Sequence, residues 1–272
     1  MPVSELVYSI LVYVFIFAFG ITIGSFLNVC IYRLPLGESL TKQNSHCMTC
    51  GAEIKRYDLI PVFSWLILRG KCRSCGAPIS PRYCVVESLN GIIYVLVFLH
   101  YDFMYYPIRA ILVCLLMSAL IVVFFMDWDT QLISNYVVLF IAFIGILDYL
   151  RCYFLLDRVK LICDAGLVSR SIGIFAVSVV LLILELASKG RAMGRGDVYL
   201  MAAAGVFLGV KAVVAAFAIG LVLGSIAGMI IKHATGSSKF AFGPWLSLGI
   251  AVAAIWGNQL GDIYLRITGF IQ

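Results

Sequence analysis

The sequence predicts an all-α polytopic membrane protein with about eight transmembrane helices and a small polar cytoplasmic loop domain between helices 1 and 2. Three observations predict this fold. Hydrophobic residues make up 62% of the 272 residues and charged residues only 12%, whereas a soluble globular protein has about 25% charged residues. Mean hydropathy is +1.04. Apolar runs long enough to cross roughly 30 Å of hydrocarbon recur along most of the chain.

The first apolar run, 6–31, has the position of a signal peptide. Asn28 and Arg33 stand at its end and no small-residue cleavage motif follows, so we expect a retained transmembrane helix. An eighth segment, 198–209, is too short to cross upright and is expected to tilt, re-enter or thin the bilayer locally. The other expected spans are 89–106, 108–126, 136–156, 166–187, 213–231 and 245–260.

Lysine and arginine are distributed unequally between the two sides of these spans. The segment 33–82 carries eight of the 20, and the loops 189–195 and 232–239 carry five more, against seven on the opposite face and its flanks. By the positive-inside rule the polar loop lies in the cytoplasm, both termini lie outside, and Asp127 and Asp197 lie on the cytoplasmic side. This asymmetry accounts for the net charge of +6, and without a basic helix or an aromatic-interleaved basic patch we expect no nucleic-acid binding.

The chain is expected to form three parts. Residues 1–33 form the first transmembrane helix, 34–88 a cytoplasmic loop domain, and 89–272 a multi-helix membrane domain. The loop domain concentrates Pro, Gly, Lys, Arg and Cys residues. About 50 residues bury too little apolar surface to fold without an additional staple, so a structural metal ion is expected in this segment.

Four cysteines of the loop have the spacing of a metal site, namely Cys47, Cys50, Cys72 and Cys75. They form two C-x-x-C pairs separated by 21 residues, and glycine follows each pair. A C-x-x-C turn directs both sulfurs at one tetrahedral ion, and glycine accepts the positive φ of such a turn. Disulfides are the alternative, but a cytoplasmic loop is kept reduced, so Zn²⁺ is the expected occupant. Four thiolates close the coordination sphere, which predicts a structural role for the metal.

Two acidic residues lie at the ends of long apolar runs, Asp127 after one and Asp197 before another. A carboxylate costs about 2.5 to 3.5 kcal/mol at the centre of a membrane helix and less near the interface, so such residues are seldom incidental. An aspartic dyad pairs a protonated carboxyl that polarises a carbonyl with a carboxylate that activates water. Gly194 and Gly196 give the backbone freedom to approach a partner loop. Solvated loop carboxylates are the alternative, and sequence physics alone does not decide between Asp127 and Asp129.

Three other acidic residues in or beside apolar runs receive structural interpretations. Glu185 lies inside an apolar stretch and is expected to pack between helices or to reach the interface. Asp102 and Asp148 are expected on the outer side, far from the candidate dyad.

A series of motifs runs in order along the chain. Together the motifs resemble those of the bacterial type IV prepilin peptidase family, which are polytopic aspartic proteases that also N-methylate their products. The resemblance covers nearly the whole chain, and the ordered set is far more specific than a lone G-x-G-D. The motifs are GSFLNV at 24–29, IYRLP at 31–35, the two cysteine pairs, DLIPV at 58–62, LRGKC at 68–72, ISPRY at 79–83, VE at 86–87, Gly91, Asp127 with Ile133, G-x-G-D at 194–197 and FGP at 242–244.

The resemblance implies which carboxylates are catalytic. In the family, the first catalytic aspartate begins a pattern of Asp, five residues, Ile or Leu, and Pro, which falls on Asp127 rather than Asp129. The second is the Asp of G-x-G-D, here Asp197. Three residues depart from the family pattern: Ser134 and Cys84, where the family usually has Pro, and Tyr199, where Lys is common. These departures concern loop geometry and a lipid or substrate contact rather than carboxyl chemistry.

The resemblance also implies the substrate and a second activity. The substrate is a prepilin or pseudopilin with a short basic leader, a glycine at the cleavage site and a hydrophobic helix inserted in the lipid bilayer of the inner membrane. Methyl transfer from S-adenosylmethionine to the new amino terminus is assigned to the segment 34–88 and its flanking helices, and cleavage to 89–272. The residues expected to bind the methyl donor are small or polar and flank the loop. The alternative role for them is helix packing and interfacial anchoring. They are Gly24, Asn28, Arg33, Glu87 and Gly91.

Two other classes of function compete with this interpretation. A non-catalytic membrane assembly subunit would use the zinc loop for docking, and it predicts that Asp127→Asn leaves activity intact. A transporter would use paired carboxylates as a proton relay, but the acidic residues gather at one face and lack a partner at the midplane. The family resemblance favours the peptidase over both.

Overall fold

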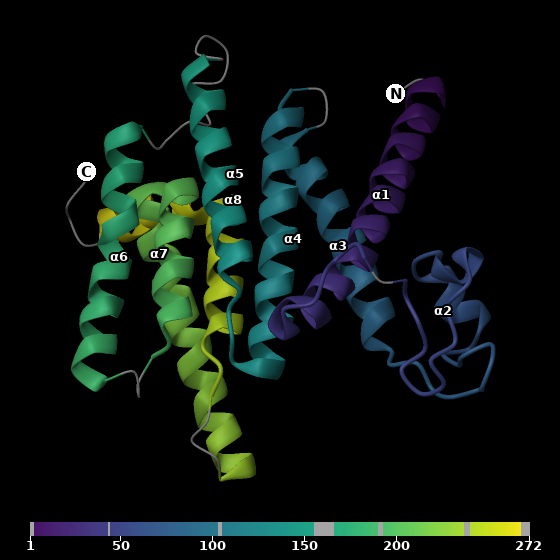
Figure 1. The fold of residues 1–272 in the computed structure, drawn as a ribbon. Helices are drawn as coiled ribbons and strands as arrows, with labels where there is room; N and C mark the ends of the chain where they lie inside the picture. The colour runs from purple at the N-terminus through teal and green to yellow at the C-terminus, as the bar shows by residue number, and fades with distance from the viewer. Residues whose placement is uncertain are drawn as a thin grey trace. The chain divides into compact units, whose positions relative to one another are not determined.

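The structure is a computed structural model of the chain, and it describes residues 3–42, 44–102, 105–154, 166–189, 193–236 and 240–267. These residues form helices joined by loops, and no strand occurs among them. The chain divides into two compact units, Met1–Val122 and Val123–Gln272. The all-α class predicted from the sequence is therefore confirmed (Figure 1).

Six helices of the described chain are long and apolar enough to cross a membrane: α1, α3, α4, α5, α6 and α7. The predicted run 245–260 lies in α8, which is not among these six because polar residues such as Asn258 and Asp262 follow its apolar half. The predicted run 136–156 extends past the end of α5 into 155–156, outside the described residues. The helices are α1 (Val3–Leu36), α2 (Phe63–Ile67), α3 (Arg82–Tyr101), α4 (Pro107–Thr130), α5 (Asn135–Phe154), α6 (Leu167–Ser188), α7 (Arg195–Thr235) and α8 (Gly243–Ile267), with a 3-10 turn η1 (Arg56–Leu59).

In the first unit, α1 and α3 pack through glycines. A Cβ atom built on Gly20 would lie 2.7 Å from the Cα of Gly91, and one built on Gly24 would lie 2.7 Å from the Cα of Glu87. The Asn90 side chain reinforces this contact by donating a 2.7 Å hydrogen bond to the Gly20 carbonyl. Small residues let membrane helices approach closely enough for backbone atoms to touch, so these glycines set the spacing of the two helices.

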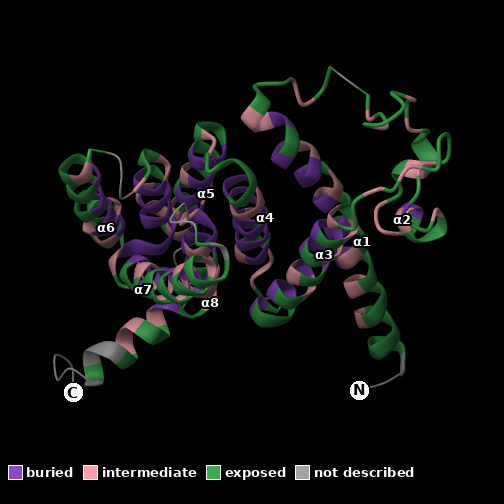
Figure 2. Ribbon diagram, turned by 90° about the horizontal axis from the view of Figure 1, so that it is seen from below, coloured by how far each residue is buried: buried purple, intermediate pink, exposed green. Residues whose placement is uncertain are grey.

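In the second unit, α7 is the central helix. It packs against α5, α6 and α8, which lie around it in Figure 1. The buried residues of this unit lie on the sides of the helices that face one another (Figure 2). Its core side chains, such as Phe207, Leu181, Ile144 and Leu246, are almost fully buried. Lipid solvates apolar side chains about as well as a protein interior does. Membrane helices therefore associate mainly through the van der Waals contacts of such dense packing.

The helix α7 breaks at Gly209, whose backbone (φ 76°, ψ 178°) is not helical. The break separates the two predicted segments 198–209 and 213–231. Helix α6 satisfies the backbone groups that the break releases. The Arg170 guanidinium donates to the Val206 carbonyl at 3.1 Å, and the Ser169 hydroxyl accepts from the Val210 N–H at 3.2 Å. A break in a membrane helix is stable only where neighbouring groups provide such partners.

Arg170 also joins α6 to α5. Its guanidinium donates to the carboxylate of Asp148 at 2.7 Å, and Arg151 donates to the other oxygen of that carboxylate at 3.0 Å. Asp148 is fully buried and both arginines nearly so. These ion pairs give Asp148 a structural role, because a buried carboxylate held by two guanidinium groups has the partners that burial requires.

The crossing of α6 and α7 depends on Gly205. A Cβ atom at this position would overlap the Gly173 backbone, with the Ile174 nitrogen 2.8 Å away. We therefore expect Gly205→Ala to lower the free energy of unfolding by about 1–3 kcal/mol through overpacking. The control Gly228→Ala lies on the same helix, and its Cβ would meet Phe240 at 3.8 Å, an ordinary contact. Thermal unfolding in detergent should show a change within about 0.5 kcal/mol for the control. Equal stability of the two variants would contradict this packing.

Candidate active site

Asp127 lies in the last turn of α4, and its carboxylate is fixed by a backbone group from a distant part of the chain. The Gly243 N–H, at the start of α8, donates to Asp127 Oδ2 at 2.9 Å. Asp127 is 5% exposed, whereas Asp129, two residues further on, is exposed. The structure therefore distinguishes the two aspartates that sequence physics left open, since Asp127 is buried and held by a backbone donor whereas Asp129 is exposed.

Asp197 lies in the first turn of α7, at the end of the G-x-G-D motif. Its backbone N–H donates to the Gly194 carbonyl at 3.2 Å, and its carboxylate accepts a hydrogen bond from the backbone of Gly194. Asp197 is 7% exposed. The carboxylate thus lies at a helix N-terminus, where free N–H groups and the helix dipole favour negative charge.

The side chain of Ile133 joins the two aspartate-bearing turns. A Cβ atom on Gly196 would lie 2.9 Å from the Ile133 Cβ, and one on Gly243 would lie 3.1 Å from the Ile133 Cδ1. Both glycines are therefore pressed against one side chain, and the charges of Asp127 and Asp197 interact. Two buried carboxyl groups whose charges interact cannot both ionise easily, which is the condition that an aspartic dyad requires.

Aromatic rings surround the turn that carries Gly243. Trp128 stacks on Phe124 with ring centres 6.2 Å apart and meets the edge of Trp245 at 6.3 Å. Trp245 in turn stacks on Phe240 at 6.4 Å. The indole N–H of Trp245 is buried and has no hydrogen-bond partner among the described residues. The aromatic side chains therefore pack around the turn that positions the Gly243 N–H, and the indole N–H of Trp245 remains as a donor.

The departure at Ser134 leaves this region well formed. Ser134 directly precedes α5, and its carbonyl accepts hydrogen bonds from the Val137 and Val138 N–H groups at 3.1 and 3.2 Å. Serine is a favoured residue at the start of a helix. The first hydrogen bonds of α5 therefore form without the proline that the family usually has at this position.

The four cysteines of the first unit gather into one cluster. Their Sγ atoms all lie within 4.8 Å of one another, and Cys47 and Cys75 Sγ are 3.9 Å apart. The two pairs have the same backbone turn: Cys47 N–H donates to Ala52 and Cys72 N–H donates to Ala77, at 2.9 and 2.8 Å. The cluster could hold a metal ion, because tetrahedral bonds of about 2.3 Å separate sulfurs by about 3.8 Å.

Two glycines make these turns possible. Gly51 and Gly76, which follow the pairs, have φ of 69° and 72°. Backbone N–H groups of Cys50 and Thr49 donate to the Cys47 sulfur and lower the pKa of its thiol to about 6. A thiolate is the form that binds a metal, and this shift favours it at Cys47, whereas the pKa of the Cys75 thiol is raised to about 11.

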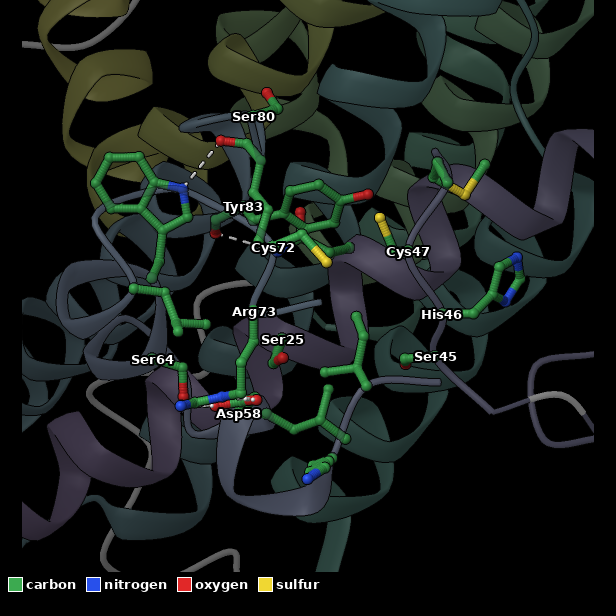
Figure 3. A pocket seen from close by; sticks show the side chains of 18 of the residues that line it. Ser25, Ser45, His46, Cys47, Asp58, Ser64, Cys72, Arg73, Ser80 and Tyr83 are labelled. Atoms are coloured by element: carbon green, nitrogen blue, oxygen red, sulfur yellow. Dashed lines mark hydrogen bonds and ion pairs between the residues drawn. The ribbon is translucent and has the colours of Figure 1, made fainter. Parts of the chain in front are cut away.

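A cavity of about 440 Å³ lies beside the cluster, within the first unit. Cys47 and Cys72 line it together with the Arg73–Asp58 ion pair, as Figure 3 shows. Its volume is in the range of about 300–1,000 Å³ that is typical of small-molecule sites. Three of the five expected methyl-donor residues, Asn28, Arg33 and Glu87, line this cavity. The other two, Gly24 and Gly91, lie instead in the contact of α1 with α3.

Glu87 connects three parts of the first unit. One carboxylate oxygen accepts from the Val62 N–H at 2.7 Å, and the carboxylate also accepts from the Ser25 hydroxyl. Val62 has φ of 63°, a conformation that a β-branched residue rarely adopts. The buried Glu87 on α3 therefore holds a strained loop residue against α1 and shapes the wall of the cavity.

Comparisons with known proteins agree with this geometry. Residues 18–101 match the bacterial peptidase A24 N-terminal domain, and residues 114–229 match the type IV leader peptidase family. A prepilin leader peptidase/N-methyltransferase of Pseudomonas aeruginosa is 30% identical over 92% of this chain and 92% of its own length. The chain belongs to the type IV leader peptidase family. The expected resemblance is therefore confirmed.

Two further relatives with the same name extend the comparison. The protein of Dichelobacter nodosus is 30% identical over 97% of this chain and 98% of its own length. That of Myxococcus xanthus is 33% identical over 82% of this chain, and the match spans 64% of the Myxococcus protein. No solved structure matches the chain.

Several residues of the candidate site have contacts that sequence reasoning did not assign. Gly243 and Ile133 stood in family motifs without a stated function, although both contact the dyad region. Val62 likewise stood in a motif, and its contact with Glu87 depends on folding. Glu185 was expected to pack or to reach the interface, and the structure pairs it with Arg195 beside Asp197.

The position of Gly243 generates a test of the site. A Cβ atom on Gly243 would lie 2.7 Å from Asp127 Oδ2. Gly243→Ala should therefore move the Asp127 carboxylate and leave the helix packing in place. A displacement of about 1 Å can reduce the rate of an enzyme about a hundredfold, and we expect a loss of this order in the kcat of leader cleavage. Gly228→Ala is the matched control and should retain the parent rate. A Gly243→Ala variant with unchanged kcat would contradict the placement of Asp127.

Proposed function

We propose that the protein cleaves the leader peptide from type IV prepilins or pseudopilins with the dyad Asp127 and Asp197, and then N-methylates the new amino terminus. The observation that carries the proposal is the burial of both carboxyl groups at one site, one held by Gly243 and the other at the start of α7. Membership of the leader peptidase family supports it. The homologue names of this family include both activities.

The dyad hydrolyses a peptide bond without a covalent intermediate. One carboxyl group is protonated and donates its hydrogen bond to the scissile carbonyl, while the other accepts a proton from the attacking water. The proton of the first carboxyl group then passes to the departing amine, and the second carboxyl group keeps the proton that it took from water. Asp127 keeps its position through the Gly243 N–H, so the pair changes protonation without changing place.

The proposed site of cleavage is the cytoplasmic face of the inner membrane. The chain is a multi-pass membrane protein, and six helices of its described part are capable of spanning the bilayer. The excess of Lys and Arg in the segment 33–82 supports a cytoplasmic position for this loop and for the dyad. Water and the basic leader of a prepilin are both present at that face.

Methyl transfer is assigned to the first unit. S-adenosylmethionine, when bound, supplies the methyl group. The cavity beside the cysteine cluster fits it in volume, and the carboxylates of Asp58 and Glu87 line the cavity, where negative charge complements a sulfonium. Asn28 and Arg33 line it as well, and they are the residues that would bind the donor's polar groups. Gly24 and Gly91 contribute by holding α1 and α3 together. On this proposal, methyl transfer belongs to 34–88 with its flanking helices and cleavage to 89–272.

The cysteine cluster is proposed to hold Zn²⁺ as a structural ion. The four sulfurs already have the spacing of a tetrahedral Cys₄ site, and two glycine turns present them. Such a site leaves no position for substrate, so the ion stabilises the loop and the adjacent cavity wall. A non-catalytic assembly subunit with a zinc docking loop would not require the buried pair of carboxyl groups.

The direct test uses purified protein, a candidate prepilin and mass spectrometry of the product. Asp127→Ala and Asp197→Ala should each reduce leader cleavage at least about a thousandfold, because loss of one dyad member removes general acid or base catalysis. Asp129→Ala is the matched control, since Asp129 is exposed on the same turn, and it should keep the parent rate within about threefold. Cleavage that survives both dyad substitutions would end the protease proposal.

Metal analysis tests the cysteine cluster separately. We expect about one zinc ion per chain by elemental mass spectrometry, and Cys72→Ser should lose it because three thiolates close the site poorly. Cys30→Ser is the control, since Cys30 is buried in α1 outside the cluster. Methyl transfer should fall together with the zinc content, because the cavity wall contains Cys72. A parent protein without metal, or a Cys72→Ser variant with full zinc content, would contradict the site.

A further inference from the structure

The turn that carries Asp197 has one long side chain of its own. Residues 194–197 are Gly, Arg, Gly and Asp, so Arg195 and Asp197 carry the only side chains of this turn. On one side the turn is fixed by the contact of Gly196 with Ile133. The N-cap residue Gly194 provides no side-chain cap for α7. The other side therefore depends on what Arg195 binds.

Arg195 binds Glu185, in the last turn of α6. Its Nε donates to Glu185 Oε1 at 3.1 Å. The Glu185 side chain is 8% exposed, whereas that of Arg195 is 73% exposed. The second carboxylate oxygen, Oε2, is buried and has no hydrogen-bond partner among the described residues. The two members of the pair thus differ: Glu185 is held by the packing around α6, and Arg195 is held mainly by Glu185.

A buried carboxylate in an apolar helix is expensive unless it has a partner, so a residue that serves only to pack would not be acidic. Glu185 has one ion-pair partner among the described residues, and that partner lies two positions before Asp197. Leu181, one turn earlier on the same helix, is fully buried and apolar, which shows that this face accepts an apolar side chain.

We infer that Glu185 is a positioning residue for Asp197: through Arg195 it fixes the N-terminal turn of α7 and thereby the direction of the Asp197 carboxyl group. The inference rests on the proposed function, because it concerns the geometry of the dyad in leader cleavage. Glu185 acts at a distance from the reacting atoms, so it should affect the rate of the chemical step more than the binding of the substrate.

The experiment measures kcat and KM for leader cleavage with four variants. Glu185→Met keeps the volume of the side chain and removes the acceptor, whereas Glu185→Gln keeps an acceptor without the charge. Arg195→Met removes the exposed partner, and the Glu185→Met/Arg195→Met double variant tests whether the two act together. Asp262→Asn is the matched control, because it removes the charge of the acidic member of the exposed Lys211–Asp262 pair, which joins α7 to α8.

The expected result is a fall in kcat of about tenfold to a hundredfold for Glu185→Met and Arg195→Met, with KM within about threefold. The double variant should be no slower than the slower single variant, because either single substitution already removes the interaction that the two residues share. Glu185→Gln should keep more activity than Glu185→Met, and Asp262→Asn should match the parent.

A kcat of Arg195→Met within twofold of the parent would overturn the inference, and so would losses that multiply in the double variant. Arg195 is exposed, so its variant decides the question even where Glu185→Met fails to fold. Thermal unfolding in detergent checks that each variant is folded. A parent protein that does not cleave a prepilin contradicts the proposed function itself, whereas a cleaving parent with unaffected variants contradicts only the role of Glu185.

Discussion

The hydrogen bond from the Gly243 N–H to the Asp127 carboxylate joins the end of α4 to the start of α8. Ile133 extends the same site to the start of α7, because its side chain contacts both Gly243 and Gly196. Three segments, of which the first and last are 116 residues apart in the sequence, thus meet around two buried carboxyl groups. If Gly243 carried a side chain, Asp127 could not occupy this position, and the chemistry attributed to the pair would lose one of its members.

The remainder of the second unit holds α7 in the orientation that the pair requires. Gly205 and Gly173 let α6 and α7 touch through their backbones, and Arg170 with Ser169 satisfies the groups exposed at the Gly209 break. These contacts lie towards the middle of α7, whereas Asp197 lies at its start. The helix is therefore anchored along its length, and Glu185 with Arg195 adds an anchor at the end where position matters most.

Much of this arrangement could be predicted from local sequence. Apolar runs gave the helices, since twenty apolar residues in water have few alternatives to a membrane span. The cysteine spacing predicted a cluster because a C-x-x-C turn places two sulfurs together by local geometry alone. Even the division of α7 was anticipated, with a predicted segment that ended at Gly209. Burial of Asp127 but not Asp129 follows from which side of α4 faces the protein, and the family pattern supplied that choice before the structure did.

What could not be predicted depends on contacts between distant segments. Nothing in the sequence around Gly243 indicates that its N–H binds a carboxylate 116 residues earlier in the chain. Val62 has a backbone conformation that its own side chain disfavours, and its N–H donates to the Glu87 carboxylate on α3, which lies far away in the sequence. Glu185 has the same local sequence context whether it packs, reaches the interface or binds Arg195. In each case, tertiary contacts override or select among local preferences.

The central claim is that the carboxyl groups of Asp127 and Asp197 form one site. The measurement that tests it most directly is their separation in an experimental structure of the protein in a lipid nanodisc. The account predicts that the nearest carboxyl oxygens lie within reach of one bridging water, about 5.5 Å or less, since each hydrogen bond to that water spans about 2.8 Å. Carboxyl groups separated by two or more water layers, with Asp127 released from the Gly243 N–H, would contradict it.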